Sequence, residues 1–496
     1  MASDLEACLS SAQVSNLSIS YSPSYLHLLD VSIQNLRFTD PSIPKPLAII
    51  IPSTKSQLQS SVLCCRRAGV SMRVRSGGHS YEGQSYISDD TRPFAIIDMM
   101  NLNAIHVDIS SNNSWVESGA TLGQVYYTVS TLSNGSLAVS AGSCSTVGTG
   151  GHISGGGFGL LSRKYGLAAD TVLDALLINH EGKVFDRMSM GPDVFWAIRG
   201  GGGGSWGVVY AWKLRLVPVP SRVTRFTLQR RCSAGEAASL LFKWQLIAPK
   251  LPDEFYLSAG VTGEINGTIT TISISFLALF LGPKYEPIAI LGSRFPELGL
   301  RDSDCVEESW LNSAAHFAGL DSTVQLNDHN AQPKTYYKAK SDYVKTRISK
   351  RELEVVLDKL VSVAQVSLIL DPYGGVMSRI RSDHLPFPHR DGNLFSIQYL
   401  IEWTAEDEQK GERGQYIEKL RGFYEFMATY VSKNPRGAYV NYMDLDLGTS
   451  VGRVEEDRVW GERYFMGNFY RLVKAKTLID HDNVFNNQQS IPPMSY

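Results

Sequence analysis

The residues best suited to chemistry lie in one glycine-rich segment, Ser140–Gly159 (SAGSCSTVGTGGHISGGGFG). Its twenty residues hold eight glycines, together with the thiol of Cys144 and the imidazole of His152. Glycine loses the most backbone entropy on folding and has no side chain to bury, so this segment gains little from its own packing. A second imidazole, His79, follows Gly77 and Gly78 in a similar setting. We therefore predict that these segments lie against a large flat ligand.

Three glycine-rich turns are predicted, at Ser76–Gly83, Ser118–Gly123 and Gly148–Gly159. Successive backbone N–H groups in such turns can hold phosphate oxygens. One such turn alone is more often only a tight turn, but three turns beside strand ends favour a ligand site. Gly202–Gly207 fits two generic glycine motifs literally, but the order of helix and strand around it is the reverse of what those motifs need. It is set aside, and the sequence shows no metal-binding motif.

The turns must be positioned by alternating strands and helices between residues 45 and 217. Strands are expected at 47–51, 70–74, 94–98, 104–108, 114–118, 172–178 and 207–217. Helices are expected from Ser53 or Thr54 to Ala68, with Gly69 as the stop signal, from Thr121 as N-cap to Leu132, and near 192–198. Upstream of residue 40, one amphipathic helical piece is expected near 23–35.

The composition changes at Val217-Pro-Val-Pro220, which predicts a domain boundary. The alternating run Thr268–Ser275 (TITTISIS) is typical of an antiparallel strand with one buried face. Further strands are expected near 366–370 and 394–402, and helices near 234–249, 306–318, 350–364 and 414–431. The last stretch, about 432–496, reads as turn-rich and aromatic.

Composition limits the class of protein. The 496 residues carry 47 basic and 49 acidic side chains, a net charge of −2, which argues against a nucleic-acid or polybasic membrane partner. No apolar run approaches the roughly 18 residues that span a bilayer. Sequons at Asn16, Asn112, Asn134 and Asn266 favour a chain of the secretory pathway, whether extracellular, vacuolar or in an ER-derived vesicle, although MASDLEACLS is not a signal peptide.

Five motifs in order resemble the plant berberine-bridge-enzyme-like flavoproteins, over essentially the whole chain. The motifs are Arg73–Gly83 (RVRSGGHSYEG), Cys144–His152 (CSTVGTGGH), Arg163–Asp170 (RKYGLAAD), Asn434–Asp446 (NPRGAYVNYMDLD) and Asn487–Pro493 (NQQSIPP). The resemblance implies an α+β fold with a two-part FAD-binding domain of the vanillyl-alcohol-oxidase (PCMH) type. It also implies a substrate domain with an antiparallel sheet covered by helices. The expected limits are 1–218 and 432–496 for the FAD-binding parts and 219–431 for the substrate domain.

The resemblance implies FAD attached covalently through both His79 and Cys144, since the family's matching residues bind the flavin 8α-methyl and C6. It places His152 near the flavin N1 and C2 carbonyl, Val147 at the position that controls O2 access, and a disulfide between Cys8 and Cys64. The pairing of Cys65, Cys232 and Cys305 stays open. The other residues expected to contact FAD are Arg75, Ser76, Gly77, Gly78, Ser80, Gly119, Thr121, Leu122, Gly123, Gly148, Gly151, Gly155, Gly156, Phe158 and Gly159.

Substrate chemistry is expected from Tyr442, Gln398 and Tyr439. Strand alternation puts Ser396 and Gln398 on one face, and a tyrosine with a perturbed pKa can act as a base during hydride transfer. The chain departs from the family pattern at three pocket positions: Phe158 replaces a tyrosine, Met443 an arginine and Ser396 a lysine. Berberine bridge enzyme itself has a glutamate base at the position of Gln398.

These departures make the expected pocket less polar and remove the cations that would lower a neighbouring tyrosine's pKa. The resemblance therefore implies an FAD-dependent oxidase of plant specialised metabolism that abstracts hydride from a phenolic, prenylated phenolic or alkaloid. Oxidative cyclisation or dehydrogenation would follow, with O2 as the final oxidant. The main alternative is a redox-neutral FAD-containing [4+2] cyclase (a Diels-Alderase), as in some mulberry-type relatives, and a non-enzymatic flavoprotein of the pollen-allergen type ranks last. The expected state is a monomer or weak dimer.

Overall fold

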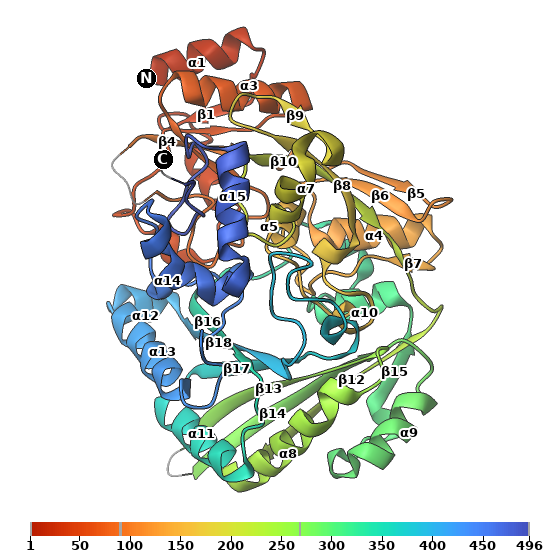
Figure 1. Ribbon diagram of the computed structural model, residues 1–496. Helices are drawn as coiled ribbons and strands as arrows, with labels where there is room; N and C mark the ends of the chain where they lie inside the picture. Colours follow the sequence, from red (N-terminus) through yellow and green to blue (C-terminus); the bar gives the residue numbers. More distant parts are fainter. Residues whose placement is uncertain (1, 89–91, 267–268, 495–496) are drawn as a thin grey trace.

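Two small sheets carry the glycine-rich turns in the computed structural model, which describes residues 2–88, 92–266 and 269–494 (Figure 1). The first sheet has the order β1-β2-β4-β3, with β4 parallel to both β2 and β3. Its strands are β1 (Leu17–Ile19), β2 (Ala48–Ile50), β3 (Ser71–Arg75) and β4 (Phe94–Asp98). The crossover helix α3 (Lys55–Arg67) is capped by the Thr54 hydroxyl, and Gly69 after it has a φ of +66°. The turn Ser76–Gly83 therefore leaves the end of β3.

The second sheet is antiparallel, with the order β5-β6-β10-β8-β9. Its strands are β5 (Ile105–Asp108), β6 (Asn113–Glu117), β8 (Val172–Ile178), β9 (Val184–Phe185) and β10 (Val208–Arg215). Helix α4 (Leu122–Leu132) begins with a capping box between Thr121 and Gln124, which confirms the predicted N-cap. The predicted strand 207–217 is interrupted, because Val217–Pro218 forms a separate strand, β11, that pairs with β7 (Leu137–Ala138).

The largest sheet has seven strands, all antiparallel, in the order β15-β12-β14-β13-β17-β18-β16. They are β12 (Val223–Cys232), β13 (Phe255–Asn266), β14 (Ile269–Phe280), β15 (Cys305–Glu308), β16 (Tyr336–Val344), β17 (Val366–Pro372) and β18 (Phe395–Trp403). Thr268, at the start of the predicted alternating run, and the side chain of the sequon residue Asn266 lie outside the described residues.

Three helices cover one face of the large sheet: α8 (Ala234–Ile247), α11 (Lys350–Val363) and α13 (Arg413–Met427) (Figure 1). Their apolar stripes share one core with the strands, in which Trp244, Leu357 and Leu420 are fully buried. The predicted antiparallel sheet covered by helices is thus confirmed, and its other face is free to form a binding site.

Several predicted elements are wrong in extent or type. The region 306–318 is not one helix: β15 pairs with β12 before α10 (Trp310–Phe317) begins behind the Ser309 cap. The piece predicted at 23–35 shortens to α2 (Tyr25–Asp30), and the helix near 192–198 begins earlier, as α7 (Arg187–Ala197), with a kink at Gly191. Pairing and packing between distant segments override these local patterns.

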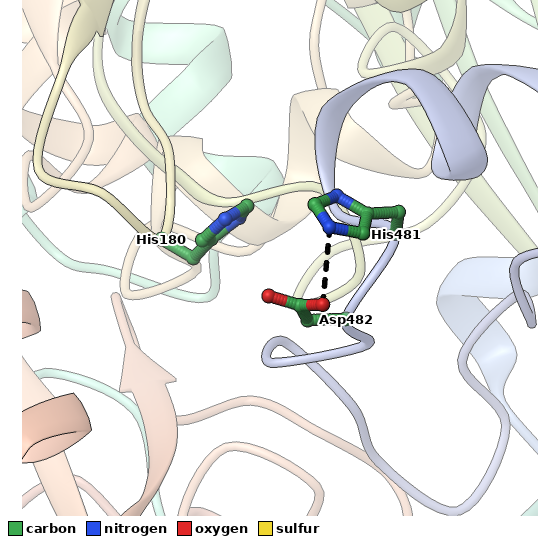
Figure 2. Close-up of side chains that lie close together, drawn as sticks. All are labelled: His180, His481 and Asp482. Atoms are coloured by element: carbon green, nitrogen blue, oxygen red, sulfur yellow. Dashed lines mark ion pairs between the residues drawn. The ribbon is translucent and has the colours of Figure 1, made fainter.

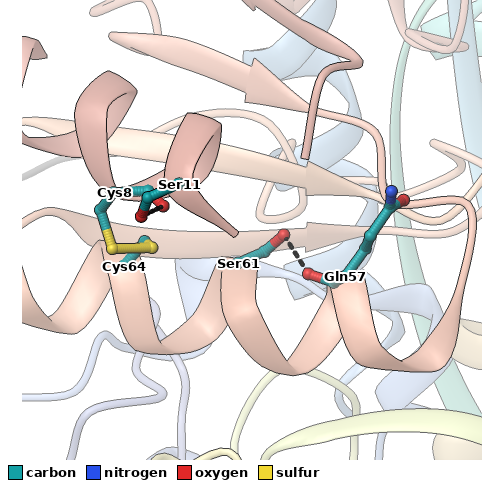
Figure 3. The surroundings of a disulfide bond; sticks show 5 residues. All are labelled: Cys8, Ser11, Gln57, Ser61 and Cys64. Atoms are coloured by element: carbon teal, nitrogen blue, oxygen red, sulfur yellow. Dashed lines mark hydrogen bonds between the residues drawn. A yellow bond between two sulfur atoms is a disulfide. The ribbon is translucent and has the colours of Figure 1, made fainter. Parts of the chain in front are cut away.

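The termini add helices that the sequence did not predict. Helix α1 (Ala2–Ser11) is joined to α3 by the Cys8–Cys64 disulfide, shown in Figure 3, and Ser61 on α3 donates its hydroxyl to the Gln57 carbonyl. At the other end, α14 (Val454–Phe465) and α15 (Phe469–Ile479) replace the expected turns. Helix α15 packs against α7, which brings the C-terminal segment back to the first two sheets (Figure 1).

Candidate functional site

A cavity of about 440 Å³ lies between the glycine-rich turns and the open face of the large sheet. Many of the predicted FAD and substrate residues line it. They are Ser76, Gly77, Gly78, His79, Ser80, Cys144, Val147, Gly148, Gly151, His152, Gln398, Tyr442 and Met443. Residues more than 350 positions apart in the chain thus share one cavity.

His79 and Cys144 approach the same hydroxyl group. His79 Nε2 lies 2.7 Å from Thr146 Oγ1, and Cys144 Sγ lies 3.8 Å from the same oxygen. Burial lowers the pKa of His79 to about 4, so its imidazole is neutral at physiological pH and keeps a nucleophilic lone pair. Burial also raises the pKa of the Cys144 thiol. The structure therefore brings together, in one wall, the nitrogen and the sulfur that the sequence singled out.

His152 presents a defined tautomer. The Gly142 N–H donates to His152 Nε2 at 3.0 Å, which leaves the ring proton on Nδ1 of the neutral imidazole. Burial lowers the pKa of His152 to about 4. The ring is therefore a neutral hydrogen-bond donor through Nδ1 at physiological pH.

The wall fits a large flat group with polar edges. Gly151 lines the cavity, and a Cβ added there would meet no atom within 4 Å, so the backbone at this point faces open space. The hydroxyl oxygens of Ser85 and Ser118, in the same lining, are buried without a hydrogen-bond partner among the described residues. Buried polar atoms normally have partners, so these two hydroxyls are exceptions in the wall beside the cavity.

Several predicted FAD residues lie outside the cavity and have structural roles. Arg75 forms a buried ion pair with Asp98, Nε to Oδ2 2.6 Å, and donates to two backbone carbonyls of α2. A Cβ at Gly119 would come within 1.8 Å of the Met99 carbonyl oxygen, so close backbone packing requires glycine there. The others that do not line the cavity are Thr121, Leu122, Gly123, Gly155, Gly156, Phe158 and Gly159.

Aromatic rings line the part of the cavity for which substrate contacts are predicted. Tyr81 and Tyr442 stack with centroids 5.2 Å apart and an interplanar angle of 8°, and Gln398 Nε2 donates to the Tyr81 hydroxyl at 2.7 Å. Burial raises the pKa of Tyr442 well above its ordinary value, and burial likewise raises that of Tyr81. Both phenols are therefore protonated at physiological pH in the protein by itself.

Tyr439 does not line the cavity. Its hydroxyl oxygen accepts from the backbone N–H groups of Gly157 and Phe158, each at 3.1 Å, and from Asn441 Nδ2 at 3.0 Å. Phe158 in turn stacks on Tyr373 at 5.1 Å, away from the cavity lining. Ser396 does not line the cavity either, although the period of two places it on the same face of β18 as Gln398. Tyr439 thus positions the glycine-rich segment.

A buried ion network holds the two tyrosine-bearing loops together. Lys338 on β16 pairs with Glu82, next to Tyr81, and with Asp444, two residues after Tyr442, at 2.8 Å. Lys340 pairs with the second oxygen of Asp444 at 2.6 Å. The coulombic attraction of these acids raises the pKa of Lys338 against the opposing effect of burial. The network therefore holds the loops that carry Tyr81 and Tyr442 in fixed positions relative to each other.

The sequence analysis missed several lining residues. Gly202–Gly204 and Trp206–Gly207, from the segment set aside as a false motif, lie in the wall, as do Phe485, Asn486 and Asn487. Leu400 and Glu402 follow Gln398 on the same face of β18. Among the described residues, Glu402 is the acidic side chain that lines the cavity, and burial raises its pKa. The two-residue period from Gln398 would have found both.

Comparison with known proteins identifies the class. Residues 46–187 match the FAD binding domain family, and residues 438–492 match the family described as berberine and berberine like. The fold and the cavity are those of an FAD-linked oxidoreductase with covalently held flavin. The chain belongs to the berberine bridge enzyme-like family.

Individual relatives match over nearly the full length. The chain is 51% identical to berberine bridge enzyme-like D-2 of Nicotiana tabacum, over 99% of this chain and 91% of the relative. It is 47% identical to reticuline oxidase of Papaver somniferum, with 99% and 92% covered. The solved structure of berberine bridge enzyme from Eschscholzia californica superimposes with a TM-score of 0.95 at 44% identity, covering 99% of this chain and all of that one.

Two observations bear on the compartment. The Cys8–Cys64 disulfide fits an oxidising environment such as the secretory pathway. Helices long and apolar enough to cross a bilayer are absent from the described ranges.

Proposed function

We propose that this chain is an oxidase of aromatic small molecules, namely phenolics, prenylated phenolics or alkaloids, which it cyclises or dehydrogenates. The observation that carries the proposal is the cavity itself, with His79 and Cys144 beside one hydroxyl on one wall and the Tyr81–Tyr442 stack on the other. Stacked phenols favour a planar aromatic guest. A relative, reticuline oxidase, bears the name of an aromatic alkaloid substrate, and a berberine bridge enzyme variant was solved with (S)-reticuline.

Bound FAD supplies a two-electron acceptor that O2 reoxidises, with release of hydrogen peroxide. In our proposal His79 and Cys144 hold the flavin by two covalent bonds, and His152 donates from Nδ1 to its polar edge. Val147 lies in the lining next to Gly148 and leaves room for O2.

On the substrate side, Tyr442 and Gln398 orient the guest. Because the Tyr442 phenol is protonated, it donates a hydrogen bond to a substrate oxygen, and it becomes a base only if the holoenzyme lowers its pKa. Glu402, at an exposed position of the lining, is the acidic group placed to pair with a substrate ammonium. An alkaloid therefore gains an ion pair that a neutral phenolic lacks.

The redox step is tested by mixing the enzyme with candidate substrates without oxygen. Bleaching of the flavin absorbance near 450 nm supports an oxidase, whereas product formed while the flavin stays oxidised overturns it. Tyr442→Phe should lower the bleaching rate by roughly 100-fold or more. Tyr126→Phe is the matched control, since it removes a buried hydroxyl bonded to the Gly142 carbonyl, outside the cavity.

The redox-neutral [4+2] cyclase is the second candidate, and one observation favours it. The neutral amide of Gln398 and the protonated phenols of Tyr81 and Tyr442 supply hydrogen-bond donors to the cavity, and the acidic residue of the described lining, Glu402, lies four positions further along β18 than Gln398. A cyclase needs hydrogen-bond donors and shape but no base. Product formed from a diene and a dienophile with the flavin unbleached would establish it.

Attachment is tested by acid denaturation of the holoenzyme. The yellow colour should precipitate with the chain, and release of flavin into the supernatant would refute covalent attachment. His79→Ala and Cys144→Ala should each keep one bond, so that only the double variant releases all flavin. Asn16, Asn112 and Asn134 are exposed, and we propose that the chain is glycosylated in the secretory pathway, which glycosidase treatment with mass spectrometry would check.

A further inference from the structure

Two histidines and an aspartate meet on the side of the molecule where the C-terminal segment returns to the second sheet. His180 lies in the turn between β8 and β9, and His481 and Asp482 follow the end of α15 (Figure 2). One ligand atom from each of the three lies within 4.8 Å of the others. Among the described residues, this is the one group of three or more His, Cys, Asp or Glu side chains that are close enough together to hold a metal ion. No motif in the sequence predicts this cluster, because 301 positions separate the two histidines.

We propose that this cluster, His180, His481 and Asp482, binds a divalent transition metal ion, for which Zn²⁺ is the best match. Two imidazole nitrogens and one carboxylate oxygen are a known ligand set for Zn²⁺, which a water completes to four. Ligand atoms in a tetrahedral Zn²⁺ site are roughly 3.3 Å apart, so the cluster must contract by about 1.5 Å at most. The side chains of His481 and Asp482 are 66% and 45% exposed and can turn freely to do so.

The buried member of the cluster, His180, lies beside a carboxylate that can orient its ring. His180 is 4% exposed, and its Nδ1 has no hydrogen bond but lies 3.4 Å from Asp480 Oδ1. When Nδ1–H turns to that carboxylate, Nε2 keeps its lone pair for the metal. A carboxylate behind a ligating histidine is the usual way in which the tautomer and ring orientation are fixed.

Asp480 is itself rigid enough for this role. It is fully buried, with Oδ2 bonded to Lys476 Nζ at 2.7 Å and to the Phe485 N–H at 2.9 Å. Oδ1 accepts from the Val484 N–H at 3.0 Å. Its place in the fold therefore does not depend on the metal.

Asp482 divides its two oxygens between two partners. Oδ1 lies 3.1 Å from His481 Nε2, whereas Oδ2 lies 3.2 Å from Arg66 Nη2. Oδ1 can thus bind the metal while Oδ2 keeps the contact with α3. The Arg66 guanidinium therefore stays paired with Oδ2, the oxygen that does not bind the metal.

The metal would fasten a segment that forms part of the FAD cavity. Phe485, Asn486 and Asn487, a few positions after Asp482, line the cavity. The β8–β9 turn on the other side is rigid, since Asn179 Oδ1 accepts from the N–H groups of Glu181 and Lys183 at 3.0 Å each. An ion between the two would restrain residues 481–487.

The test is calorimetric titration of ZnCl2 into the chelator-treated holoenzyme, with any affinity tag removed. One equivalent of Zn²⁺ should bind with a Kd in the micromolar range. His481→Ala and Asp482→Asn should each weaken binding by about tenfold or more. Both residues are exposed, so neither change should prevent folding. His384→Ala is the matched control: His384 is also exposed and next to an aspartate, Asp383, but belongs to no such group.

Hydrogen exchange gives a readout that does not depend on activity. Zn²⁺ should slow amide exchange in residues 179–183 and 481–487 of the wild-type holoenzyme and not of His481→Ala. The proposal is overturned if no stoichiometric binding occurs at 100 µM Zn²⁺. It is also overturned if His481→Ala binds like the wild type or if exchange in both segments is unchanged.

Discussion

One end of the cavity is walled mainly by backbone, whereas the other end is walled by side chains. At the FAD end the wall is largely backbone, from the turns around Gly77, Gly148 and Gly203, and its specific side chains are few. At the end that we propose for the substrate, the wall is made of side chains, Tyr81, Tyr442 and Gln398, each from a different segment. A backbone wall depends on the absence of side chains, whereas a side-chain wall depends on what holds the loops in place. The two ends should therefore fail in different ways.

The largest expected effect lies behind the substrate wall. Lys338→Met should lower the free energy of unfolding by about 3–5 kcal/mol, because it leaves buried carboxylates without their shared cation. Denaturant unfolding followed by fluorescence would measure it. Lys410→Met is the control, since its pair with Glu406 is exposed to solvent and contributes little to stability. Equal effects of both changes would contradict the role of the network.

The second-largest effect is expected in the pH dependence of the free energy of unfolding. Burial raises the pKa of Asp371, on β17 near the tyrosines, to about 6 from an ordinary value near 4. The folded state therefore favours the protonated acid, and this contribution to stability, complete below about pH 4, is lost as the pH rises to about 6.

Asp371→Asn should remove that contribution, so the difference in stability between variant and wild type should change by about 2 kcal/mol between pH 4 and pH 6.5. The variant should gain relative to the wild type as the pH rises. Unfolding at a series of pH values measures the difference, in which the other titrating groups cancel. A constant difference would show that Asp371 titrates normally.

At the FAD end, a single added methyl group should be enough to disturb the wall. A Cβ at Gly148 would lie 2.3 Å from the Gly77 backbone nitrogen, so Gly148→Ala forces two turns apart. We expect a loss of about 1–3 kcal/mol in stability and a clear fall in the ratio of flavin to protein absorbance. Gly292→Ala, on α9 (Tyr285–Arg294) with open space around it, should keep the flavin and be neutral or stabilising. Full flavin content in Gly148→Ala would argue against a backbone wall.

The smallest effect is expected for one hydroxyl on the substrate wall. Tyr81→Phe keeps the ring stacked on Tyr442 but removes the acceptor for Gln398 Nε2. A hydrogen bond of this kind is worth about 1 kcal/mol, so kcat/KM for the substrate found anaerobically should fall about fivefold. Flavin content should not change. A loss of flavin instead would mean that the two ends are not independent.

Local patterns predicted the elements whose signals lie close in sequence. Thr121 and Thr54 cap helices as expected, and the strands predicted for the first two sheets lie near their predicted positions, although β1 and β9 were not predicted. The patterns failed where distant pairing decides the structure. Val306 belongs to a strand only because β12 lies beside it, and the two C-terminal helices form against a core assembled from the rest of the chain.

The sequence by itself determined the FAD end. The glycines, the thiol and the two imidazoles of this wall lie in two contiguous motifs, Ser76–His79 and Cys144–His152. Only the tertiary structure decided which of the predicted substrate residues line the cavity. Tyr439, Phe158 and Ser396 lie outside the lining, whereas Tyr81 and Glu402 belong to it. It also joined His180 to His481 across most of the chain. Contacts between segments far apart in the chain depend on tertiary packing, and the spacing of residues within one segment does not predict them.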